Sequence, residues 1–90
     1  MSYKIRILHP EGDDEIYEMS KQPSLEELQE TVGGWIEIVP ADCGDTVLDL
    51  IVHEEGKLLN LPYNPKASEY AGRPIVGTAV LFEEGRFGDG

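Results

Sequence analysis

The residues best suited to nucleophilic chemistry are one cysteine, Cys43, and two histidines, His9 and His53. A catalytic thiolate needs a histidine base within hydrogen-bond reach and a third group that orients this base. Cys43 is expected in a turn, the histidines stand at the ends of two different predicted strands, and no family signature surrounds the cysteine. The pattern favours a protein that is not an enzyme, and a small hydrolase is kept as an alternative.

The acidic stretch DCGDTVLD comes nearest to a metal-binding motif. A calcium loop between two helices needs acidic residues at alternate positions, a central glycine and a terminal glutamate, and Asp42, Asp45 and Asp49 lack this spacing. One cysteine and two histidines cannot supply a zinc quartet. The glycines after Val32 follow a predicted helix, whereas a phosphate-binding loop opens one. The sequence therefore predicts no metal and no cofactor.

Negative charge is the most unusual property of the chain. Its 18 acidic and 7 basic residues give a formal net charge of −11. Binding to nucleic-acid phosphates depends on Lys and Arg, and anionic membranes attract the same side chains. We therefore expect no direct nucleic-acid or membrane binding and predict a basic protein partner. A purely solubilising role for the acidity stays open.

Ten carboxylates that lie in predicted turns or on the outer face of a predicted helix are the candidate partner-binding residues. Each cluster alone is also typical of a solvated turn or helix face. The candidates are Glu11, Asp13, Asp14, Glu15, Glu26, Glu30, Asp42, Asp45, Glu54 and Glu55.

The size and the single cysteine indicate one small domain in a reducing compartment. Ninety residues leave room for one core, which we place at residues 1–84, followed by a flexible acidic and glycine-rich tail at 85–90. No disulfide can form within the chain, and the N-terminus has no apolar signal core. These features predict a cytoplasmic protein.

Two segments have helix signals. In SLEELQETVGG, Ser24 and Glu27 form a capping box, and Leu25, Leu28 and Val32 make an apolar stripe. We expect Gly33 to end this helix in the left-handed conformation and Gly34 to lead into a strand. Asn64 before Pro65 is typical of a helix start, so a short helical turn is expected up to Gly72.

Six segments have the apolar pattern of strands, separated by turn residues. The Trp35–Val39 strand is expected to place Ile36 and Ile38 in the core, with Trp35 buried on its other face. A tight hairpin is expected where Glu54–Gly56 meets 57–61. The segments are Tyr3–Leu8, Glu15–Met19, Trp35–Val39, Thr46–His53, Lys57–Leu61 and Pro74–Phe82.

The order of these elements predicts an α+β fold. We expect a small mixed sheet of five to six strands with one main helix. A hairpin, a long helix and a late apolar strand that returns to the middle of the sheet favour a ubiquitin-like, or β-grasp, roll.

The segments Leu28–Val39, Glu54–Ala67 and Ile75–Leu81 resemble a family of small uncharacterised proteins found in bacteriophages, plasmids and their hosts. The shared pattern consists of glycines, a turn asparagine and apolar positions, and it includes Gly33, Gly34, Trp35, Asn64 and Gly77 as structural residues. The resemblance implies a fold and assigns no active site. It also implies a phage accessory protein, a class that often acts by disabling a host protein.

The charge and the resemblance together favour a non-enzymatic acidic protein that inhibits a host nucleic-acid-binding or defence protein by mimicking nucleic acid. The alternative from another class is an oligomer that binds or sequesters a nucleotide or metabolite. That function would need the basic residues to converge, among them Lys4, Arg6, Lys57, Lys66 and Arg73. The sequence leaves the oligomeric state undetermined.

Overall fold

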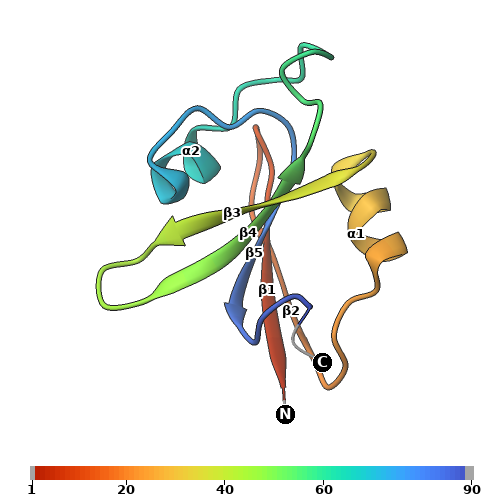
Figure 1. Cartoon of the computed structure of the whole chain (residues 1–90), viewed down its shortest axis with the longest axis vertical. Coiled ribbons are helices and arrows are strands. Elements are labelled where there is room, and N and C mark those ends of the chain that lie inside the picture. Colours follow the sequence, from red (N-terminus) through yellow and green to blue (C-terminus); the bar gives the residue numbers. More distant parts are fainter. Residues whose placement is uncertain (1, 89–90) are drawn as a thin grey trace.

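The structure, a computed structural model that describes residues 2–88, contains five strands and two helices, with one helix after each of the first two strand pairs (Figure 1). The elements are β1 (Tyr3–Leu8), β2 (Glu15–Met19), α1 (Leu25–Val32), β3 (Ile36–Asp42), β4 (Val47–His53), α2 (Pro65–Ala71) and β5 (Ala79–Glu84).

The five strands form one sheet in the order β2-β1-β5-β4-β3, so the α+β class is confirmed. The apolar β5 lies in the middle, as predicted, between β1 and β4. All four strand pairs are antiparallel, so the mixed sheet does not form and the ubiquitin-like roll is not confirmed. The physical reason is that the connection from β4 to β5 stays at one end of the sheet, and β5 must then run back.

Each face of the sheet carries one helix and one apolar cluster. On the α2 face, Leu8, Val39 and Leu50 pack with Ala67 of the helix. On the α1 face, Ile51 and Phe82 pack with Leu28 and Val32. The helices do not cover the sheet evenly, because α1 lies over β3, β4 and β5, and α2 lies over β3. The β1–β2 side of the sheet is therefore the least covered.

Helix α1 begins and ends where the sequence predicts. The Ser24 hydroxyl accepts a hydrogen bond from the Glu27 amide at 3.1 Å, and the Glu27 carboxylate accepts one from the Ser24 amide at 3.0 Å. Gly33 has φ 92°, the expected left-handed conformation. Leu25 was expected in the buried stripe, but it is 46% exposed, while Leu28 and Val32 are buried against the sheet.

Strand β3 differs from its predicted form. It begins at Ile36 and continues through Pro40 to Asp42, so the predicted turn is shorter. Ile36 packs at the margin of the α1-face core, but Ile38 on the same face is 46% exposed. The expectation of a buried Ile38 was wrong because β3 is an edge strand and α1 covers only its beginning.

The predicted hairpin around Gly56 is wrong, since residues 54–60 form consecutive turns with no strand. Gly56 does not have a positive φ, and the residue that does is Asn60, at 53°. A Cβ atom on Gly56 would lie 2.8 Å from the Val76 side chain. Glycine is therefore needed here for a close approach between two segments, which a local turn pattern does not reveal.

The last described residues lie against the sheet. Phe87 packs edge-on against Phe82, and its amide donates to the Asp49 carboxylate at 3.2 Å. The domain boundary at Glu84 and the flexibility of the tail stay predictions, and residues 89 and 90 lie outside the described residues.

Candidate functional site

Six of the ten candidate carboxylates are at the same end of the sheet. Strand β1 turns into β2 at this end, and β4 leaves the sheet here next to the start of β3. The two loops that carry the carboxylates also meet, because Glu11 lines a groove of about 440 Å³ with Leu61 and Pro62. We call this the acidic end and define it by Glu11, Asp13, Asp14, Glu15, Glu54 and Glu55.

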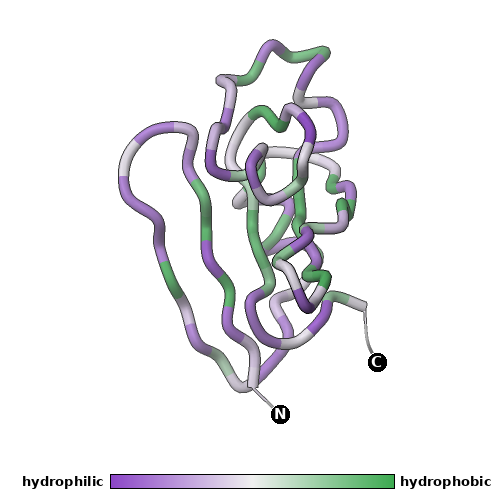
Figure 2. Tube along the Cα trace, turned by 90° about the vertical axis from the view of Figure 1, so that its left-hand side faces the viewer, coloured by the Kyte–Doolittle hydropathy of each residue, from purple (hydrophilic) through white to green (hydrophobic). Residues whose placement is uncertain are grey.

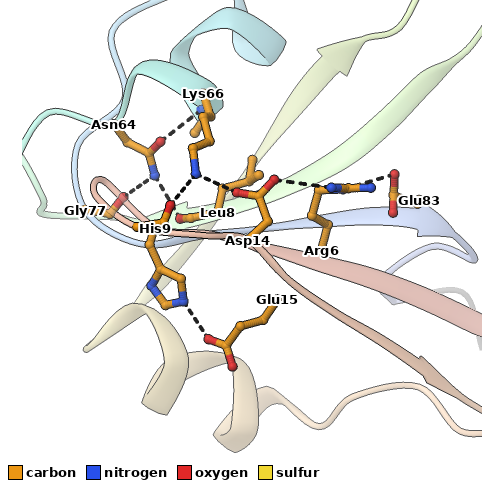
Figure 3. A network of polar contacts seen from close by, with 11 residues as sticks. Arg6, Leu8, His9, Asp14, Glu15, Asn64, Lys66, Gly77 and Glu83 are labelled. Carbon is orange, nitrogen blue, oxygen red and sulfur yellow. Dashed lines mark hydrogen bonds and ion pairs between the residues drawn. The ribbon is translucent and has the colours of Figure 1, made fainter.

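Asp14 is part of an internal charge network and is not free to bind a partner (Figure 3). Its carboxylate accepts from the Lys66 ammonium at 2.7 Å and from the Arg6 guanidinium at 3.2 Å. Arg6 is also 3.3 Å from Glu83 of β5, and Lys66 donates to the Gly12 carbonyl at 2.7 Å. The hydrogen bond from Lys66, assisted by Arg6, lowers the pKa of Asp14 against the effect of partial burial. Asp14 therefore anchors the β1–β2 turn to α2.

Glu15 is also held by neighbours. One of its oxygens is 2.6 Å from His9 Nε2, and the other accepts from the Tyr17 hydroxyl at 2.7 Å. The hydrogen bond from Tyr17 and then that from His9 lower the pKa of Glu15, and the same contact raises the pKa of Tyr17. The side chain is exposed, so it stays available to solvent from a fixed position.

The other eight candidates are exposed and form no ion pair among the described residues. Four of them, Glu11, Asp13, Glu54 and Glu55, are at the acidic end. Asp42 and Asp45 flank the turn at the opposite end of β3 and β4, where Asp42 accepts from the Gly44 amide at 3.0 Å. Glu26 and Glu30 lie on the outer side of α1 and are both exposed.

Trp35 is 65% exposed, so the prediction that it is buried was wrong. Trp35 comes directly before β3 and lies on the same face of the sheet as Val39. Helix α2 covers Val39 and Ala41 on this face but does not extend as far as Trp35. Its carbonyl accepts from the Glu54 amide at 2.8 Å, which fixes it next to the acidic end. Sequence reasoning therefore missed an exposed aromatic residue beside a pair of carboxylates.

Other apolar side chains are exposed in the loop that follows Glu55. Leu58 is 81% exposed, and Leu59 and Tyr63 are each 58% exposed. The available signal in the sequence was the Leu-Leu pair between Lys57 and Asn60. The acidic end thus combines unpaired carboxylates with exposed apolar groups.

A groove of about 550 Å³ lies beside α2 between Asp14 and the turn after β3. Lys66, Glu69 and Tyr70 form its helical wall, and Asp42 and Cys43 lie at its far side. Cys43 is exposed and lies at the opposite end of the sheet from both histidines. The structure does not bring thiol and imidazole together, and the absence of enzymatic activity stays a prediction.

No group of three or more His, Cys, Asp or Glu side chains within residues 2–88 is arranged to hold a metal ion. None of the described helices has the length and apolar character needed to cross a membrane.

The basic residues named for the small-ligand alternative are spread over several surfaces. Lys57 and Arg73 line a groove of about 210 Å³, but Glu37, Glu54 and Glu55 line it too. Arg73 is 3.5 Å from Glu37, and Arg6 and Lys66 are held by Asp14. Lys4 lies opposite Glu84 of β5 in the register of the two strands. Ligand sequestration by an oligomer stays a prediction that a native-mass measurement can test.

Comparison with known proteins gives one finding. The family model described as a domain of unknown function, DUF3846, matches residues 4–89. No curated protein and no solved structure matches the chain.

Proposed function

The chain belongs to the DUF3846 family, whose function is unknown, and we propose that it is a non-enzymatic binding protein that captures a basic protein through its acidic end. The observation that carries this proposal is the distribution of charge. Arg6 and Lys66, two of the seven basic residues, are held in the internal network around Asp14, while Glu11, Asp13, Glu54 and Glu55 have no cationic partner among the described residues.

Unpaired carboxylates at one end of a small protein produce a directional negative potential. Such a potential increases the rate at which a basic partner associates and orients it before contact, and salt screens it. Each exposed ion pair contributes only about 0.2–1 kcal/mol, so four carboxylates supply a few kcal/mol together. Affinity then needs an apolar contact as well.

Trp35 supports the proposal as this apolar contact. Exposed tryptophans are enriched among the residues that dominate interface energies, because a large rigid side chain buries much surface at little entropic cost. Trp35 is held at the acidic end by the hydrogen bond between its carbonyl and the Glu54 amide. A partner that places basic groups against Glu54 and Glu55 can also cover the indole.

We further propose that the partner's basic surface is one that normally binds nucleic acid. Duplex DNA presents about one negative charge per 1.7 Å of its axis, and a surface built for that density attracts closely spaced carboxylates. This is the mimicry expected for a phage or mobile-element protein that inhibits a host nucleic-acid-binding or defence protein. The proposal predicts mutually exclusive binding of this chain and nucleic acid.

Two charge variants test where the partner binds. Each variant neutralises four exposed carboxylates of a protein whose formal net charge is −11. The two variants therefore carry the same charge and differ only in where the carboxylates are removed. The test variant is Glu11→Gln, Asp13→Asn, Glu54→Gln, Glu55→Gln. The control variant is Glu26→Gln, Asp45→Asn, Glu69→Gln, Glu84→Gln.

Wild type and both variants are immobilised, and the proteins that each retains from a nuclease-treated lysate are compared. Each retained protein is then purified, and its affinity for wild type and for both variants is measured. We expect the test variant to bind the partner about fivefold or more weakly, while the control stays close to wild type. Equal loss in both variants would reduce the interaction to non-specific charge and overturn the proposal. A duplex oligonucleotide that fails to release the partner would overturn mimicry alone.

A further inference from the structure

The sheet has two edge strands, and they differ in how well their outer edges are protected. Strand β3 contains Pro40, which has no amide to donate, and its Glu37 is paired with Arg73. Strand β2, with the sequence EIYEM, contains no proline, glycine or lysine, and its five pairs with β1 run without a register shift. Natural proteins block edge pairing with proline, bulges or charged side chains, and the only such feature of β2 is its two carboxylates, Glu15 and Glu18, which repel an acidic strand and not a basic one.

Strand β2 is also largely exposed on both faces, and only Met19 at its end packs at the margin of the α1-face core. Ile16 is 49% exposed and Tyr17, which points to the opposite face, is 45% exposed. Helix α1 lies over β3, β4 and β5 and helix α2 over β3, so neither crosses β2. Figure 2 shows the β1–β2 hairpin along one side of the molecule, at the left of the view. The outer edge of β2 therefore presents backbone amides and carbonyls without a strand partner.

The α1 face beside β2 has room for the side chains of an added strand. A groove of about 270 Å³ lies between the β1–β2 hairpin and α1, and Tyr17, Met19 and Pro23 line it together with Leu28. An added strand directs alternate side chains to this face and the others towards Ile16. Both faces offer apolar contacts to such a strand.

The charge around β2 identifies the occupant. Glu15 and Glu18 lie in the strand, and Glu11 and Asp13 lie in the adjoining turn. A second copy of the chain on this edge would bring these carboxylates close to those of the first copy. Like charges on two molecules of net charge −11 would repel each other. We propose that the outer edge of β2 pairs with an extended basic segment of the protein partner, in which Lys or Arg alternates with apolar residues. This inference rests on the proposed function and adds the mode of recognition.

The probe is a capped peptide of about ten residues in which Lys and Val alternate, a length that matches one strand. Its control has the same lysines with proline in place of valine, so the charge is kept and the backbone donors are reduced. Amide hydrogen exchange is followed by NMR. We expect the Lys/Val peptide, and not its control, to slow exchange of the outward amides of β2 about tenfold or more, because strand pairing protects backbone amides.

Two isoleucines provide matched variants. Ile16 in β2 and Ile38 in β3 are 49% and 46% exposed, one on each edge strand. Threonine keeps the β-branched shape in both, and neither side chain is in the core, so both variants are expected to fold. Ile16→Thr should weaken binding of the Lys/Val peptide about threefold or more, while Ile38→Thr should leave it unchanged.

The inference would be overturned if the proline peptide protected the β2 amides equally well. It would also be overturned if the Lys/Val peptide protected only amides outside β2. The β2 amides could instead be protected without any peptide, with protection and native mass both rising as the protein concentration rises. That result would show that a second copy is the occupant and would also overturn the inference. If β2 shows no protection while the acidic-end variant still loses its natural partner, the edge inference fails and the proposed function stands.

Discussion

Asn64 offers the most direct test of how this fold is held together. Its side chain is fully buried and joins three segments. The amide oxygen accepts from the Ala67 amide at 3.0 Å and caps α2, and the amide nitrogen donates to the Leu8 carbonyl at 2.9 Å and to the Gly77 carbonyl at 2.8 Å. The end of β1, the start of α2 and the approach to β5 therefore depend on one side chain (Figure 3).

Asn64→Ala removes all three hydrogen bonds and leaves their partners in a buried environment. Leu8 is 1% exposed and Ala67 is fully buried, so water does not replace the lost partners without rearrangement. A buried polar group that loses its hydrogen bond costs about 1–3 kcal/mol, and loss of a helix cap costs about 1 kcal/mol. We expect a loss of about 3 kcal/mol or more, from a total of about 5–13 kcal/mol for a domain of this size.

Urea unfolding followed by far-UV circular dichroism measures this loss, and the midpoint temperature of thermal unfolding should fall by roughly 12–24 °C. The control is Asn60→Gly, which changes an exposed asparagine at φ 53° to a residue that accepts this conformation. It should change the free energy of unfolding by less than about 0.5 kcal/mol. A loss below about 1 kcal/mol for Asn64→Ala, with an unchanged denaturant slope, would refute the structural role.

Asn64→Asp refines the same test because it preserves the shape. A carboxylate oxygen would face the Leu8 and Gly77 carbonyls at the distances now bridged by the amide nitrogen. The buried acid should stay protonated in the fold, so its folded-state pKa is expected above its unfolded value. Stability then is greatest below the unfolded pKa and falls as pH rises through the folded one. A variant whose stability does not fall with rising pH would contradict this geometry.

The remaining predictions concern three other residues. Gly33→Val should destabilise the fold by about 1–2 kcal/mol through backbone strain alone, because the site has open space but φ is 92°; chemical unfolding measures this. Trp35→Ala should reduce the free energy of unfolding by less than about 1 kcal/mol, since the indole is 65% exposed, yet weaken partner binding. The pKa of Asp14 in the folded state is below its usual 3.8. The carboxylate therefore contributes its full share of folding stability above pH 3.8, and this share is lost as the pH falls through the folded-state pKa. The difference in unfolding free energy between wild type and Asp14→Asn should shrink from about pH 5 to pH 2.

Features encoded within a few neighbouring residues were predictable. The capping box of Ser24 and Glu27 and the left-handed Gly33 form as expected, and Asn64 caps α2 through Ala67 with Pro65 in the first turn. In each case the chemistry that decides the conformation lies within five residues. Distant neighbours decide the other features: the prediction failed at Gly56, where the side chain of Val76, twenty residues later, leaves no room for a Cβ atom.

The candidate site was predictable in composition and not in arrangement. The carboxylates are visible in the sequence, but Asp14 pairs with Lys66 across 52 positions. Nothing in the local pattern separates this internal carboxylate from Asp13 beside it. The acidic end becomes visible only once β1 and β4 are known to finish at the same end of the sheet.

The misassigned faces of β3 have a common geometric cause. Alternation along a strand shows which residues share a face, but it does not show how far a helix covers that face. Ile36 is covered by α1 and Ile38 is not, while Val39 is covered by α2 and Trp35 is not, so burial changes face along one strand. Two short helices cannot cover a five-stranded sheet, and the uncovered parts are its margins. Trp35 and β2 lie at these margins, next to the unpaired carboxylates, and so the incomplete cover itself produces surfaces that combine negative charge with apolar contact.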